Sequence, residues 1–234
     1  MSAQREQVLD YSWLHDDSEE DLVGADWHQH AIRALSTSLQ ALADERRWPW
    51  HVGDQLTLVG EKPNGKEWRP APDVSIHPQL GPEQRQDIDV RVEGPPALVL
   101  EVASASTWTY DVSLERTRRG KRQAGKAFGY LVLLRVPEYL VFDPRGEFLA
   151  GQVRAWQRVG DVIQPWLPDA DGSYHSQSLG ITLRPDGILL RVFDPEGNPV
   201  PYWFEAARTA RAQAQEIAEL RAALERLRRP EPRA

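Results

Sequence analysis

Apolar residues recur at helical spacing near the start of the chain. After Asp26, which reads as an N-cap, they fall every three or four positions and predict a helix that ends near Arg47, before Pro49. The apolar face of this helix consists of Ala31, Leu35, Leu39 and Leu42. The spacing therefore predicts an amphipathic helix packed on the core.

The middle of the chain alternates short apolar runs with turn-forming residues, which predicts strands. The runs lie at residues 55–59, 73–77, 97–102, 138–142, 152–157, 162–166, 181–183 and 188–193. The run at 97–102 is interrupted only by Glu101 and is typical of a central strand buried on both faces. Residues 124–134 predict a second helix, whereas the polar stretches 79–96 and 105–120 predict loops. The order of elements indicates an α/β or α+β domain with a mixed sheet flanked by helices.

The C-terminal segment has a different composition. Residues 205–229 contain neither Gly nor Pro, and their apolar positions alternate spacings of three and four, which is an a/d seam. The seam consists of Ile217, Leu220, Leu224 and Leu227. We expect a coiled coil that forms a homodimer; the alternative is a helix that packs back on its own domain. The predicted organisation is a flexible lead-in (1–24), a main domain (25–202), the C-terminal helix (203–229) and a tail (230–234).

The composition narrows the choice of chemistry. The chain has no cysteine, which excludes thiolate metal sites and a cysteine nucleophile. Its net charge of −7 has the wrong sign for phosphate contacts, but a local basic cluster lies at Arg116, Arg118, Arg119, Lys121, Arg122 and Lys126. The nine tryptophans are scattered and form no recognisable stacking platform. No apolar run approaches the ~20 residues of a membrane span, so we expect a cytoplasmic protein.

Two acids stand out against the strand pattern. Burying the unpaired carboxylate of Glu101 within an apolar strand costs several kcal/mol unless a cation, a base or water compensates. Alone, Glu101 is as consistent with a solvent-facing strand edge as with a site. Asp73 begins another predicted strand, and two acids near one sheet edge supply the oxygen ligands that Mg²⁺ prefers. Such a metal activates water and neutralises phosphodiester charge.

The residues around these acids resemble the Uma-two family of endonucleases in the PD-(D/E)xK superfamily. The resemblance rests on four strings in this order: Pro72-Asp73-Val74, Leu100-Glu101-Val102-Ala103-Ser104, Ser106-Thr107 with Asp111, and Pro137 to Pro144. The segment Asp26 to His30 is similar to the start of the family's first helix. The resemblance covers roughly residues 20–200 and implies a restriction-endonuclease-like core that cleaves DNA with Mg²⁺ or Mn²⁺.

The resemblance also implies roles for individual residues. Asp73 and Glu101 match the two metal-binding acids. The superfamily's usual lysine position holds Ala103, so the lysine role passes to Lys126, which precedes Tyr130 by one helical turn, with Lys121 as runner-up. The residues with accessory roles are Asp111, as a further acid or a helix cap, and His28, as a site-lining or structural group. The DNA contacts fall to Arg116, Arg118, Arg119 and Arg122.

Two other functions remain open at this stage. The nuclease fold can be retained in a catalytically inactive protein that binds nucleic acid or acts through its coiled coil, which Ala103 and the acidic charge favour. A two-carboxylate glycosidase is a third hypothesis, and it would need exposed aromatic side chains around the acids. The sequence favours a metal-dependent endonuclease that hydrolyses DNA phosphodiester bonds.

Overall fold

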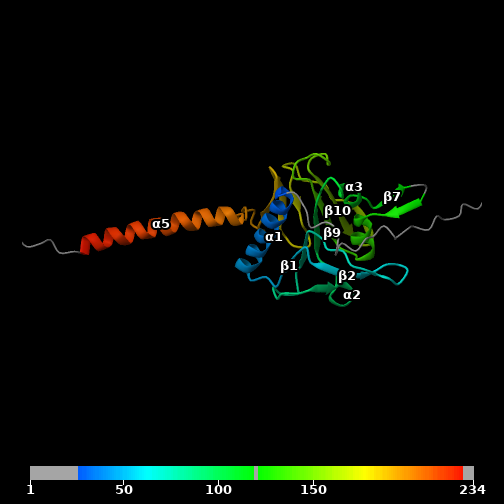
Figure 1. Cartoon of the computed structure of the whole chain (residues 1–234), viewed down its shortest axis with the longest axis horizontal. Helices are drawn as coiled ribbons and strands as arrows, with labels where there is room; N and C mark the ends of the chain where they lie inside the picture. The colour runs from blue at the N-terminus through cyan, green and yellow to red at the C-terminus, as the bar shows by residue number, and fades with distance from the viewer. Residues whose placement is uncertain (1–25, 119–120, 229–234) are drawn as a thin grey trace, which may run out of the picture. The chain divides into compact units, whose positions relative to one another are not determined.

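The computed structural model describes residues 26–118 and 121–228 of the 234-residue chain. The chain divides into two units, Met1–Val200 and Pro201–Ala234. The first unit holds the sheets, and the second consists of the long helix α5 (Trp203–Arg228) (Figure 1). The expected lead-in (1–24) and tail (230–234) lie outside the described residues.

A six-stranded sheet forms the centre of the first unit, and five of its strands match predicted apolar runs. Its strands, in spatial order, are β1 (His51–Asp54), β4 (Val74–His77), β6 (Leu98–Val102), β9 (Glu138–Phe142), β10 (Val153–Val159) and β11 (Val162–Pro165). Strands β6 and β9 run parallel, and the other neighbours are antiparallel. The predicted mixed sheet is confirmed. All residues of β6 and β9 are buried, as expected for central strands.

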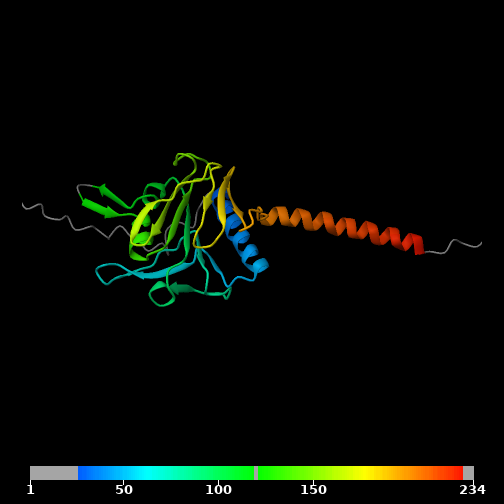
Figure 2. The ribbon, with the colours of Figure 1, turned by 180° about the vertical axis from the view of Figure 1, so that it is seen from behind.

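Helices cover both faces of this sheet. Helix α1 (Asp26–Arg46) packs its apolar stripe against β1, β4 and β6. On the other face of the sheet, the side chains of Val99 and Tyr139 pack in a core cluster with Tyr130 and Leu131 of the second helical segment. That segment consists of the short helix α4 (Lys126–Phe128) and the π-helix η1 (Gly129–Leu133). Figures 1 and 2 show the sheet between α1 and this segment.

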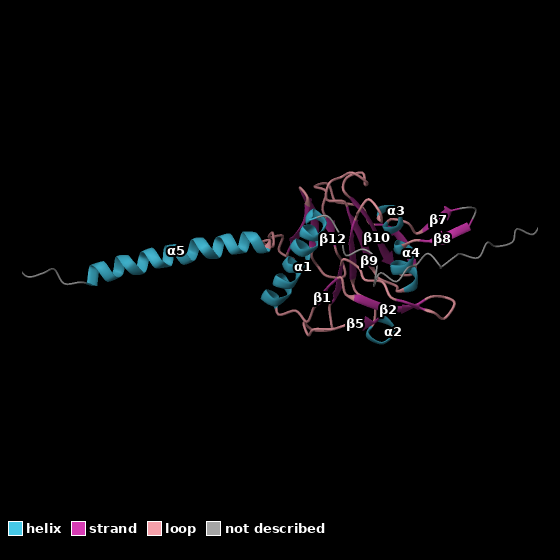
Figure 3. Cartoon of the chain, in the orientation of Figure 1, coloured by secondary structure: helices cyan, strands magenta, loops and turns pink. Residues whose placement is uncertain are grey.

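The remaining elements are short (Figure 3). One small sheet joins β3 (Glu67–Trp68), β2 (Thr57–Glu61) and β5 (Asp87–Asp89), and another joins β12 (Tyr174–His175), β13 (Thr182–Asp186) and β14 (Leu189–Phe193). A two-stranded hairpin joins β7 (Glu115–Arg118) and β8 (Lys121–Ala124). The one-turn helices are α2 (Val90–Glu93) and α3 (Trp108–Asp111).

Two of the predicted loops are wrong. Residues 79–96 contain β5 and α2, and residues 105–120 contain α3 and β7. These elements are too short and too polar for their apolar residues to show a helical or strand periodicity. Strand β5 buries Ile88 and forms by parallel pairing with β2, so tertiary contacts determine it. The strand β1 was missed for the same reason: it pairs His51 with His77 of β4 and carries no apolar alternation.

Candidate active site

The pairing of β4 with β6 brings the two predicted acids together. In the antiparallel register Val74 lies opposite Leu100, so the next position places Asp73 opposite Glu101. The Oδ2 atom of Asp73 accepts a hydrogen bond from the backbone N–H of Val102 at 2.7 Å. Both acids are buried, at 8% and 3% exposure, so neither simply faces water at a sheet edge.

Glu101 has two partners on the helical segment that covers its face of the sheet. The hydroxyl group of Tyr130 donates to Oε1 of Glu101 at 2.9 Å. The Nζ atom of Lys126 lies 3.5 Å from the same oxygen. Residues four apart share one face of a helix, which is why both side chains reach a single carboxylate. The structure thus brings Lys126 to the place that Ala103 leaves without a lysine.

Lys126 also contacts the carboxylate of Asp111. Asp111 precedes the β7–β8 hairpin in the chain, and Lys126 follows it. The Nζ atom of Lys126 lies 3.6 Å from Oδ1 of Asp111, the last residue of α3. The hairpin leaves after α3 and returns before α4, where the N–H of Gly125 donates to the carbonyl of Leu114. Gly125 packs so closely on the backbone of Ser113 that a Cβ atom would overlap its carbonyl oxygen. The long insertion between Asp111 and Lys126 therefore loops out without separating them.

His28 approaches the acids from α1. Its Nε2 atom lies 2.9 Å from the carbonyl oxygen of Val102 and 3.8 Å from Oδ2 of Asp73. A carbonyl oxygen only accepts, so Nε2 carries a proton. Nδ1 of His28 is buried and has no hydrogen-bond partner among the described residues. His28 therefore lies beside Asp73 at the end of β6.

Burial and charge have opposite effects on the pKa of Asp73 but act in the same direction on the pKa of Tyr139. Burial raises the pKa of Asp73, and the opposing effects come from His28, the Val102 N–H, Lys126 and Gln55. Burial also raises the pKa of Tyr139 well above its usual value, and the charges of Glu101 and Asp111 add to the effect. The cluster is a buried group of acidic side chains around Lys126.

The donor atoms fit a hard divalent cation. Asp73 and Glu101 offer carboxylate oxygens, and Mg²⁺ is commonly held by one or two carboxylates, with water and phosphate completing its shell. Within residues 26–118 and 121–228, no group of three or more His, Asp or Glu side chains is arranged as a complete metal cage. Two carboxylates suit a cation whose remaining ligands are water and substrate oxygens.

The residues predicted to contact DNA belong to the segment between α3 and α4. Arg116 and Arg118 lie in β7, and Lys121 and Arg122 lie in β8. Their side chains are not described, and Arg119 lies outside the described residues. Residues 115–118 and 121–124 pair as a hairpin, which lies in the chain between Asp111 and Lys126.

Two groups that form hydrogen bonds to the site residues were not predicted from the sequence. Tyr139, whose hydroxyl donates to the carbonyl of Asp111 at 2.9 Å, was read only as part of a strand. The N–H of Val102 binds Asp73, and no side-chain pattern reports a backbone donor. The alternation along β9 places Tyr139 on the same face as Val141, toward Tyr130, and is the one signal that pointed to it.

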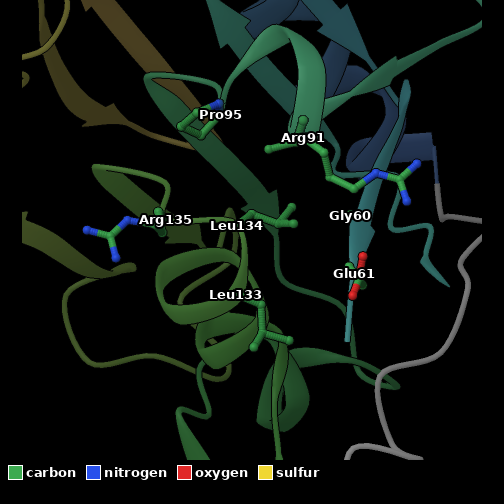
Figure 4. A pocket seen from close by; sticks show the side chains of 8 residues that line it. Gly60, Glu61, Arg91, Pro95, Leu133, Leu134 and Arg135 are labelled. Atoms are coloured by element: carbon green, nitrogen blue, oxygen red, sulfur yellow. The ribbon is translucent and has the colours of Figure 1, made fainter. Parts of the chain in front are cut away.

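A separate hollow lies away from these acids. It has a volume of about 360 Å³ and is lined by residues of β2, α2 and the end of η1 (Figure 4). Its two arginines form ion pairs, Arg91 with Asp89 and Glu67, and Arg135 with Asp161. None of the candidate site residues lines this hollow.

The comparison with known proteins bears on the acid–acid–lysine cluster. Residues 19–164, more than half of the chain, match the Uma2 family, which is described as "Putative restriction endonuclease". The chain belongs to the Uma2 family. The resemblance seen in the sequence is thereby confirmed, and the matched residues include the whole cluster around Lys126.

Other comparisons add little to the Uma2 assignment. One solved structure, described as a "putative nuclease belonging to DUF820" from Anabaena variabilis, is similar at 11% identity and a TM-score of 0.41. The similarity covers 64% of this Uma2 chain and 72% of that chain. No curated protein matches the chain. Among the residues that the structure describes, no helix has the length and apolar character to cross a bilayer.

Proposed function

We propose that this Uma2 protein is a metal-dependent endonuclease that hydrolyses DNA phosphodiester bonds with Mg²⁺ or Mn²⁺. The observation that carries the proposal is the convergence of Lys126 on Glu101, which lies beside Asp73. An acid–acid–lysine set suits phosphodiester hydrolysis, and membership of a family described as restriction endonucleases supports it.

Each residue of the set has a distinct task in this proposal. Asp73 and Glu101 would hold the cation, which when bound supplies Lewis-acid stabilisation of the phosphodiester charge. Lys126 orients the attacking water or stabilises the charge that develops on the phosphate. Tyr130 fixes the Glu101 carboxylate, and His28 holds the end of β6 through the carbonyl of Val102. Arg116, Arg118, Arg119 and Arg122 contact the DNA backbone and fix its position.

A cleavage assay tests this function. Purified protein is incubated with linear duplex, supercoiled and single-stranded DNA in Mg²⁺, in Mn²⁺ and in EDTA. The proposal requires cleavage that EDTA abolishes and that Glu101→Gln loses, while Glu61→Gln, which changes an exposed acid of β2, retains it. Metal-dependent cleavage that survives Glu101→Gln would show that another site is responsible.

We also propose that two chains associate through α5. Three apolar side chains of the seam are half exposed, at 48% for Ile217, 58% for Leu220 and 54% for Leu224. With Ile217 and Leu224 at a and Leu220 at d, Glu216 occupies g and Arg221 the following e position. A parallel pair places these opposite charges across the interface, and Ile at a with Leu at d favours two strands. The expected assembly is a parallel homodimer.

The mass of the protein in solution tests this assembly. Light scattering should give twice the chain mass for the wild type and the single chain mass for Leu220→Lys. Ala222→Lys, on the opposite face of α5, should leave the dimer intact. A wild-type monomer, or a dimer that Leu220→Lys does not dissociate, would contradict the proposal.

A catalytically inactive binding module is the second candidate. Ala103 at the usual lysine position and the net charge of −7 favour it. It predicts nucleic-acid binding without cleavage under every metal condition of the assay above. Cleavage that depends on Glu101 would exclude it.

A further inference from the structure

Four side chains from distant parts of the sequence gather at the end of the sheet that carries the acids. They are Trp27 of α1, Trp108 of α3, and Arg145 and Phe148 of the turn after β9. The tryptophans are scattered in the sequence, so the fold makes an aromatic group that the chain pattern did not show. We call these four residues the aromatic rim.

Contacts tie one side of the rim to the site through His28. The rings of Trp27 and His28 lie 5.9 Å apart, centroid to centroid, in an edge-on arrangement. His28 in turn holds the carbonyl of Val102 and approaches Asp73. The guanidinium group of Arg145 lies 5.9 Å from the centre of the Trp27 ring and also pairs with Glu147 at 2.8 Å. Trp27 is therefore one residue removed from the acid cluster.

The other side of the rim is tied to the site through α3. Trp108 lies one turn before Asp111, which contacts Lys126, and residues three apart share a helix face. The ring of Trp108 is nearly parallel to that of Phe148, at an angle of 14° and a centroid distance of 6.0 Å. Trp108 and Phe148 are both half-buried, so each ring remains partly open to solvent.

The turn that carries Arg145 and Phe148 is held rigidly at the end of β9. The buried carboxylate of Asp143 accepts hydrogen bonds from the N–H groups of Arg145, Phe148 and Leu149. β9 is joined to β6 at this end, because the N–H of Ala103 donates to the carbonyl of Phe142 at 2.7 Å. Figures 1 and 2 show the start of α1 and α3 at this same end of the sheet. The rim thus borders the carboxyl ends of the two parallel strands, where open α/β sheets bind ligands.

We propose that the aromatic rim stacks an unpaired nucleobase beside the scissile phosphate, so that the substrate is a single strand or a duplex with an extruded base. This inference rests on the proposed nuclease function and names its substrate class. Partly exposed aromatic rings can offer a flat face to a base, and paired bases inside a duplex present no free face. Arg145 adds a positive charge beside the Trp27 ring, which suits a neighbouring phosphate better than a neutral sugar.

The experiment measures binding separately from cleavage. A Glu101→Gln protein, checked for its fold by circular dichroism, is titrated in EDTA against three labelled oligonucleotides: a single strand, its perfect duplex and a duplex with a central unpaired base. Fluorescence anisotropy gives the Kd of each. The proposal expects the single strand and the bulged duplex to bind more tightly than the perfect duplex.

Rim variants in the same background identify the residues responsible. Trp108→Leu and Trp27→Leu should each weaken single-strand binding by roughly 5- to 100-fold, the range of one lost base stack. Trp108→Tyr, which keeps an aromatic face, should restore most of it. Trp203→Leu, at a half-exposed tryptophan of α5, is the matched control and should bind as the parent does.

Two results would overturn the rim assignment: equal affinity for all three oligonucleotides, or unchanged single-strand binding by Trp108→Leu. The two proposals fail separately. Cleavage by the wild type without any preference for unpaired bases rejects the rim and leaves the nuclease. Rim-dependent binding without cleavage under any metal condition rejects the nuclease and retains a base-binding rim.

Discussion

The Nζ atom of Lys126 lies 3.5 Å from Oε1 of Glu101 and 3.6 Å from Oδ1 of Asp111. One buried ammonium group thus faces two buried carboxylates that come from a strand and a short helix. The strand position that usually carries the lysine holds Ala103, which is fully buried in the core. Lys126 reaches Glu101 and Asp111 from the helical segment that covers this face of the sheet. It places one positive charge beside the two carboxylates.

Replacing Lys126 by methionine should lower the rate of DNA cleavage by about 10²–10³-fold, the typical cost of losing one group that stabilises developing charge. The change also leaves two buried acids without their cation, so the free energy of unfolding should fall by about 3 kcal/mol or more. Steady-state cleavage and urea denaturation measure the two effects. Lys66→Met, at an exposed lysine, should change neither. Full activity in Lys126→Met would remove the lysine from the mechanism.

Two buried tyrosines provide a matched pair. Tyr130→Phe removes a hydrogen bond to the Glu101 carboxylate, and Tyr139→Phe removes one to the backbone carbonyl of Asp111. Each should lower the free energy of unfolding by about 1 kcal/mol. Only Tyr130→Phe should also weaken Mg²⁺-dependent cleavage, since it alone removes a hydrogen bond that positions the Glu101 carboxylate. Equal effects of both variants on cleavage would show that Tyr130 acts through packing.

Gly125 allows α4 to approach α3. A Cβ atom at this position would overlap the carbonyl oxygen of Ser113, which is backbone and cannot rotate away. Gly125→Ala should therefore lower the melting temperature and move Lys126 away from Asp111, with a loss of cleavage. Gly65→Ala, in an exposed turn at a φ of +76°, strains the backbone but brings no atom near the new Cβ, so it should lower the melting temperature without a loss of cleavage. A Gly125→Ala protein with wild-type stability and activity would contradict the packing.

His77 should make the stability of the fold sensitive to pH. Burial, with His51 and Arg85 nearby, lowers the pKa of His77 from 6.5 to about 4. The unfolded chain therefore binds a proton below about pH 6.5 that the folded chain does not bind until about pH 4. Stability should fall as the pH drops through this window, by about 3 kcal/mol in total.

Urea denaturation at pH 7 and pH 4.5 measures this loss. His77→Phe should remove most of the pH dependence, and His175→Gln, which changes an exposed histidine, should retain it. Equal pH dependence in the wild type and His77→Phe would rule out His77 as the source.

The sequence predicted those parts of the fold that have a strong period of their own. Helix α1, the buried strands β6 and β9, the β10–β11 hairpin and helix α5 all follow from apolar spacing. Elements such as β1 and β5 could not be predicted, because pairing with a distant strand stabilises them and their own sequence is polar.

The candidate site was predicted to a similar extent. The acids at Asp73 and Glu101 followed from the strand pattern and the family resemblance. The pairing of Asp111 with Lys126 depends on how the β7–β8 hairpin folds out, which the spacing along the chain does not report. The aromatic rim forms because three segments that are distant in the sequence meet at one end of the sheet. The positions of the tryptophans along the chain therefore could not predict it.

We propose that Asp73 and Glu101 hold a divalent cation. Calorimetric titration of Mn²⁺ into metal-free protein, without DNA, measures this binding. We expect one ion bound per chain, with binding lost in Glu101→Gln and in Asp73→Asn and retained in Asp161→Asn, which changes an exposed acid. Folded wild-type protein that binds no ion, or that binds it equally well without either carboxylate, would show that these two acids are not the metal ligands.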